Sequence, residues 1–103
     1  MLWIETVAER LVNLDHVMSI DMTHNKGAQS HWSLDAIWYD GSGRTTILRG
    51  GVNQNSDFVY TAYRLLRDAI DTDLGGQIIY ADTLVRRANA LMKEKLEVAN
   101  ESK

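Results

Sequence analysis

The sequence of 103 residues is long enough for one domain with a single hydrophobic core. Its 45% hydrophobic and 24% charged residues are typical of a globular protein. The absence of cysteine excludes disulfides and thiolate metal sites, and the net charge of −3 argues against a general nucleic-acid-binding protein, which needs a basic surface. The chain has neither a signal-peptide pattern at its start nor an apolar run of about 18 residues, so we expect a cytoplasmic protein without a membrane span.

The first half of the chain has the pattern of β-strands. Residues 2–5 and 10–14 are expected to pair as a hairpin across a short turn. Residues 16–23 and 32–39 alternate, and their apolar side chains share even positions: Met18, Ile20, Met22, Trp32, Leu34, Ala36 and Trp38. The segment DGSG predicts a tight turn before a return strand at 44–49, because glycine tolerates positive φ. The pattern predicts an antiparallel meander of four or five strands within residues 1–50.

Two helices are predicted after the strands. The first, residues 55–72, begins with Asn55 or Ser56 as a cap and has apolar residues at helical spacing: Val59, Ala62, Leu66, Ala69 and Ile70. The second, residues 82–99, begins at Asp82. Gln77 to Tyr80, between them, fits either a strand or a helix lead-in.

Strands first and helices second predict a single α+β domain over residues 1–103, with a helix packed on one face of the sheet. The second helix then shares that face or finds a partner in another copy of the chain. Its apolar stripe is the predicted interaction surface and consists of Leu84, Ala88, Leu91, Met92 and Leu96.

His24 and His31 stand at the ends of a glycine-containing turn and are weak candidates for a metal site. Pairing the two apolar sets places His24 on the apolar row and His31 on the opposite row, so the two side chains diverge. Zinc needs three or four convergent ligands, and we therefore predict no metal or other cofactor.

Two registers satisfy the apolar pattern of this hairpin. One places Asp21 opposite Asp35, and like charges that face each other are destabilising. The other pairs Asp21 with Ser33 and Ser19 with Asp35, and it is the register that we predict. These four polar residues are candidates for acid–base chemistry, but a solvated sheet face explains them without catalysis, so we predict that the protein is not an enzyme.

Trp38, Tyr39 and Arg49 are candidate contacts to single-stranded nucleic acid, since bases stack on aromatic side chains. Such a site also needs a positive groove. In residues 1–54 the basic side chains are outnumbered by the acidic ones: Arg10, Lys26, Arg44 and Arg49 against Glu5, Glu9, Asp15, Asp21, Asp35 and Asp40. Charge therefore disfavours nucleic acid as a partner.

The sequence favours a small non-catalytic protein-interaction module, working as an oligomer or as an accessory or inhibitory subunit. Its expected partner is another protein or a second copy of the chain in a homodimer. The first alternative is a single-stranded nucleic-acid-binding protein that uses the aromatic residues of the sheet. The second alternative is a small metal-dependent or acid–base enzyme.

Overall fold

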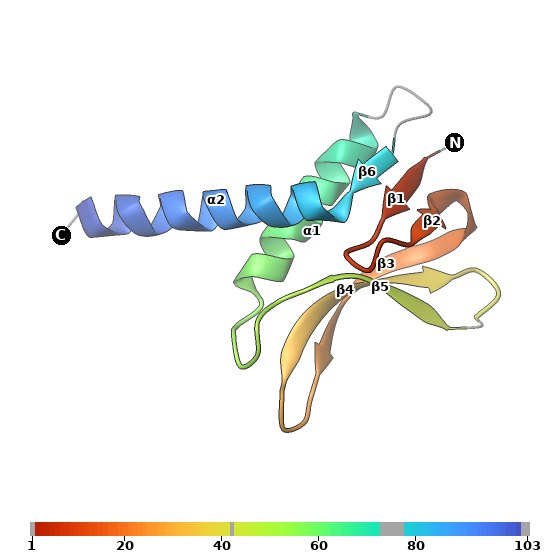
Figure 1. The fold of residues 1–103 in the computed structure, drawn as a ribbon, viewed down its shortest axis with the longest axis horizontal. Helices are drawn as coiled ribbons and strands as arrows, with labels where there is room; N and C mark the ends of the chain where they lie inside the picture. Colours follow the sequence, from red (N-terminus) through yellow and green to blue (C-terminus); the bar gives the residue numbers. More distant parts are fainter. Residues whose placement is uncertain (1, 42, 73–77, 102–103) are drawn as a thin grey trace.

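The computed structural model describes residues 2–41, 43–72 and 78–101 (Figure 1). The elements follow in the order β1 (Trp3–Glu5), β2 (Leu11–Asn13), the 3-10 turn η1 (Leu14–His16), β3 (Val17–Asn25), β4 (His31–Trp38), β5 (Arg44–Arg49), α1 (Asp57–Asp71), β6 (Ile78–Tyr80) and α2 (Ala81–Glu101). The predicted α+β class is confirmed.

The strands form two three-stranded sheets. One sheet is the antiparallel meander β3-β4-β5, and in the other β1 pairs with β2 antiparallel and with β6 parallel. The segment that the sequence left open is therefore a strand over Ile78–Tyr80, and Gln77 lies outside the described residues. The first hairpin and the meander, predicted as one sheet, belong to separate sheets, because β1 is paired on both sides within its own sheet.

α1 follows the predicted amphipathic pattern. Val59, Ala62 and Leu66 are buried against the meander sheet, as their helical spacing predicts. Asn55 supplies the side-chain acceptor at the start of the helix, since its Oδ1 accepts a hydrogen bond of 3.1 Å from the Asp57 N–H. α1 therefore begins two residues later than its predicted range of 55–72.

One core lies between both sheets and the two helices. It contains Ile4, Val12, Leu34, Ala36, Ile47, Leu48, Val59, Ala62, Leu66, Ala81, Leu84 and Ala88. A bulge in the pairing of β4 with β5 lets consecutive residues of β5, Ile47 and Leu48, both be fully buried. The N–H of Val7, in the β1–β2 turn, donates a 3.0 Å hydrogen bond to the Ile47 carbonyl and so ties the two sheets together.

The register of β3 with β4 differs from the prediction. Asp21 lies directly opposite Asp35, whereas the predicted register paired Asp21 with Ser33. The observed register faces Ile20 with Ala36 and Met22 with Leu34, so it keeps the apolar rows together. The expected penalty for facing carboxylates is reduced because Asp21 is exposed to solvent while Asp35 is paired with Arg44 from β5.

Candidate functional site

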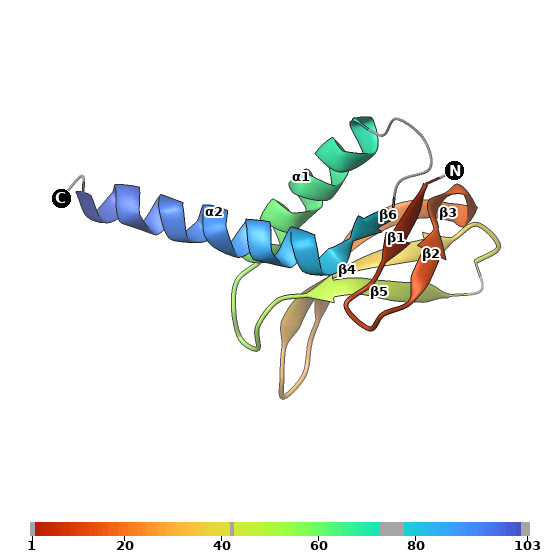
Figure 2. The same ribbon diagram turned by 45° about the horizontal axis from the view of Figure 1, so that its top comes forward.

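The C-terminal half of α2 extends beyond the rest of the molecule. Figures 1 and 2 show that α2 extends away from the body, so that the C-terminal end of this helix lies far from both sheets. The predicted interaction stripe therefore divides in two. Leu84 and Ala88 are part of the protein's own core, Leu84 being 3% exposed, while Leu91 and Leu96 are 44% and 64% exposed.

A groove lies where α2 separates from the body. Its volume is about 310 Å³, and its walls are Gly51 and Gln54 from the β5–α1 loop, Phe58 from α1, and Asn89 and Met92 from α2. Met92 contacts α1 directly, since its sulfur accepts a 3.7 Å hydrogen bond from the Thr61 hydroxyl.

The sequence identified Met92 but missed the rest of this groove. Gln54 lies in a loop without periodicity, and Phe58 is an apolar residue that packs partly against the core, which alone does not indicate a groove. Asn89 is a polar residue beside an apolar stripe, and no local pattern shows that it borders a hollow. The groove forms only when α1 and α2 pack together, so no local sequence pattern predicts it.

The two candidate histidines are directed to different partners. The His24 ring stacks on Trp32, with ring centroids 4.6 Å apart and planes 8° from parallel. His31 pairs across the hairpin with Asn25, and its Nδ1 lies 3.1 Å from the Gln29 carbonyl oxygen. The register places His24 on the even row and His31 on the odd row, which confirms the predicted divergence of these side chains.

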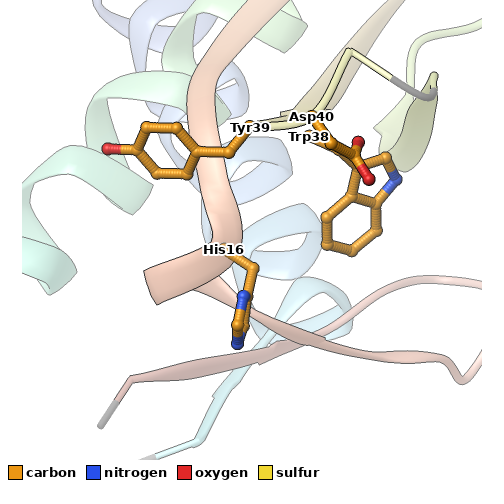
Figure 3. Close-up of a pocket in the computed structure, with 4 residues that line it drawn as sticks. All are labelled: His16, Trp38, Tyr39 and Asp40. Atoms are coloured by element: carbon orange, nitrogen blue, oxygen red, sulfur yellow. The ribbon is translucent and has the colours of Figure 1, made fainter.

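The three candidate nucleic-acid contacts do not form one surface. Arg49 pairs with Ser33 on β4. Ser33 is five positions before Trp38, so about 17 Å of strand separates Trp38 from the residue that Arg49 pairs with. Trp38 packs against the core and lines an open hollow with His16 and Asp40, whereas the Tyr39 ring points away from Trp38 (Figure 3). Tyr39 follows β4 in the turn, and because its ring points away from Trp38, the two side chains cannot stack together on neighbouring bases of a single-stranded nucleic acid.

The polar face of the meander holds one buried charge. Asp35 is 2% exposed, and its Oδ2 lies 3.5 Å from Nη1 of Arg44. The same guanidinium nitrogen donates a 3.1 Å hydrogen bond to the Thr23 hydroxyl. Ser33, also buried, accepts a 2.9 Å hydrogen bond from the Asn25 side-chain amide. The four predicted polar residues are thus not equivalent, because Asp35 and Ser33 are enclosed while Asp21 is exposed.

Within the described ranges, His, Asp and Glu side chains do not gather in groups of three or more that could hold a metal ion. Neither α1 nor α2, over its described residues, has an apolar stretch of the kind that crosses a bilayer. The free half of α2 with its groove is the candidate interaction site. No protein-family model matches the chain, and no curated protein or solved structure is significantly similar to it.

Proposed function

We propose that this protein is a small, cytoplasmic, non-catalytic interaction module that works as a homodimer joined through the C-terminal half of α2. The observation that carries the proposal is the change in exposure along one apolar stripe, from 3% at Leu84 to 64% at Leu96. Helices in proteins are stabilised mainly by packing of an apolar face. The stripe continues past the part of the body described in the structure, and a second surface that covers Leu91 and Leu96 would stabilise this half of the helix.

A second copy of the chain offers such a surface. In a two-fold dimer the same patch of both subunits forms the interface. If a side chain of one subunit fills the groove of its partner, the same side chain of the partner fills the groove of the first subunit. Leu96 lies one helical turn beyond Met92, which lines the groove. Two antiparallel copies of α2 can therefore place each Leu96 against the other copy's Met92 and Phe58.

The expected dimer is small and reversible. Full burial of a leucine side chain contributes about 1.5–3 kcal/mol, and these leucines are already partly covered. Association costs at least about 4 kcal/mol in lost translational and rotational freedom. A few buried leucines and methionines per copy thus support a dissociation constant in the micromolar range or weaker.

Charge does not drive this pairing. The sequence around Leu96 has two basic residues, Lys93 and Lys95, and two acidic residues, Glu94 and Glu97, so this segment has no net charge. Electrostatic interactions between two copies therefore contribute little, and salt screens them. We expect moderate salt to leave the dimer intact.

The test is sedimentation velocity over a series of protein concentrations, with Leu96→Ser and Leu11→Ser as matched variants. Leu11, on the edge strand β2, is 57% exposed and thus similar to Leu96 in type and exposure. We expect the native chain to dimerise with increasing concentration, Leu96→Ser to remain a monomer where the native chain is dimeric, and Leu11→Ser to behave like the native chain. A native chain that is monomeric throughout, or an equal effect of the two substitutions, would overturn the proposal.

A further inference from the structure

A third hollow, independent of α2, lies between the β1–β2 turn and β5. Both ribbon views show this turn against β5, and the hydrogen bond from Val7 to Ile47 joins the two segments (Figures 1 and 2). The hollow has a volume of about 230 Å³, and the polar side chains that line it are Thr6, Arg10, Arg44, Thr45, Thr46 and Arg49. We call it the arginine pocket.

The arginine pocket concentrates positive charge in an acidic protein. Three of the four basic residues in positions 1–54 line it, although the whole chain has a net charge of −3. Its lining contains no Asp or Glu. Among the residues that the structure describes, the guanidinium groups of Arg10 and Arg49 have neither an ion pair nor a hydrogen bond. Two unpaired cations beside one hollow repel each other, so a bound anion would relieve a cost of the unliganded fold.

Hydrogen bonds within the turn hold the backbone that supplies Arg10. The Thr6 N–H donates to the Arg10 carbonyl at 2.8 Å, and the Glu9 N–H donates to the Thr6 carbonyl at 2.9 Å. The Arg10 N–H donates to the Thr6 hydroxyl oxygen at 3.2 Å, and Glu9 adopts a left-handed conformation with φ of 61°. The pocket wall is therefore formed before any ligand arrives, which lowers the entropic cost of binding.

Thr6 provides a hydrogen-bond donor inside the pocket. Its side chain is 2% exposed, and its oxygen already accepts the Arg10 N–H. The hydroxyl proton has no acceptor among the described residues. A buried donor normally finds an acceptor, and an anionic oxygen in the pocket would supply one.

The net charge of the arginine pocket depends on the ion pair between Arg44 and the buried carboxylate of Asp35. Asp35 neutralises Arg44 from the interior at 3.5 Å and so fixes the position of that guanidinium. Three arginines and this one carboxylate leave a net charge of +2. A phosphate monoester carries close to two negative charges at neutral pH and has three equivalent oxygens, and guanidinium groups bind such oxygens in bidentate geometry.

We propose that the arginine pocket binds a phosphate dianion, either free or as the terminal group of a small phosphomonoester. Arg10 and Arg49 bind its oxygens, and the Thr6 hydroxyl donates a hydrogen bond to it. Arg44 adds to the positive electrostatic potential of the pocket. A carboxylate, with one charge and two oxygens, leaves part of this donor set unused. The backbone of nucleic acid, with one charge per phosphodiester, matches the +2 charge of the pocket less well than a terminal phosphate does.

The test is an NMR titration of the full chain with inorganic phosphate and with phenyl phosphate, each against chloride at equal ionic strength. We expect saturable shifts of the amide signals of residues 6–10 and 44–49 with phosphate but not with chloride. Tighter binding of phenyl phosphate identifies a monoester as the ligand, and equal or weaker binding identifies free phosphate. No saturable shift, or tighter binding of a single-stranded oligonucleotide than of either phosphate, would overturn the proposal.

Three substitutions assign the binding to the pocket. Arg10→Gln and Arg49→Gln each remove an exposed, unpaired guanidinium, and we expect each to weaken phosphate binding about tenfold, the value of one charge-assisted contact. Arg64→Gln removes an exposed arginine of α1 and is the matched control, with unchanged binding expected. Native-like amide spectra of all three variants establish that the fold is intact. Binding that survives both pocket substitutions, or that falls equally in Arg64→Gln, would contradict the assignment.

Discussion

The Asp35 carboxylate is held by Arg44 through one oxygen only. Oδ2 lies 3.5 Å from the guanidinium, which is a long contact for an ion pair, and Oδ1 is buried without a hydrogen-bond partner among the described residues. Asp21 lies directly opposite on β3 and adds a second negative charge nearby. The fold thus depends on Arg44, a half-exposed side chain, to compensate a carboxylate in its interior.

Arg44→Gln should destabilise the protein by about 2 kcal/mol, because it leaves the buried charge of Asp35 without a counter-ion. This value is below that of a fully buried pair, since solvent reaches Arg44. Urea unfolding of the native chain and the variant measures the loss. In the double variant Asp35→Asn/Arg44→Gln the charge itself is gone, and most of the stability should return. A double variant as unstable as the sum of its single changes would show that the pair is not coupled.

The helices were predictable because their signals are local. The stripe Val59, Ala62 and Leu66 and the acceptor at Asn55 are contained in one segment, and both are found as expected. The same holds for the placement of His24 and His31 on opposite rows, which follows from alternation along two adjacent strands. Each of these features needs no knowledge of distant residues.

Features that depend on distant contacts were not predictable. The pairing of β1 with β6 joins segments more than 70 positions apart, and three apolar residues over Ile78–Tyr80 carry no sign of their partner. The choice of register was wrong because it weighed the repulsion of Asp21 and Asp35 without the cation that Arg44 brings from β5. The arginine pocket was missed for the same reason, since Arg10 and Arg49 come together only when the two sheets pack.

Leu84→Asp and Leu96→Asp should have opposite effects on stability and association. Leu84 is buried in the core, so an aspartate there places an unpaired charge in an apolar site and should cost about 4 kcal/mol or more. Leu96 is mostly exposed, and its substitution should change monomer stability by less than about 0.5 kcal/mol while it prevents dimerisation. Urea unfolding at low protein concentration measures the stability of each monomer. Equal losses of stability would place Leu96 in the core and remove it from the proposed interface.

His24→Ala should destabilise the β3–β4 hairpin by about 0.5–1 kcal/mol, because it removes the parallel ring contact with Trp32. His16→Ala is the control, since His16 is an exposed histidine of η1 and should tolerate the change within about 0.5 kcal/mol. Thermal unfolding followed by circular dichroism compares the two variants. A loss in His16→Ala equal to that in His24→Ala would show that the stack contributes nothing specific.

Gly50→Ala should destabilise the junction of β5 with α1 by about 1–2 kcal/mol through overpacking. An added Cβ would lie 3.2 Å from Cγ2 of Val59 and 3.6 Å from the Trp32 carbonyl oxygen, which already accepts the Gly50 N–H at 2.8 Å. That hydrogen bond prevents residue 50 from moving away, so the strain falls on Val59.

The neighbouring glycine provides the control for this prediction. At Gly51 an added Cβ meets only the side chain of Gln54, which is exposed and can rotate aside, so Gly51→Ala should cost much less. In the double variant Gly50→Ala/Val59→Ala the new methyl group occupies space that Val59 vacates, and urea unfolding should show a smaller loss than the sum of the single losses. Strict additivity would mean that the strain is taken up elsewhere than at Val59, and that β5 rather than α1 yields at this junction.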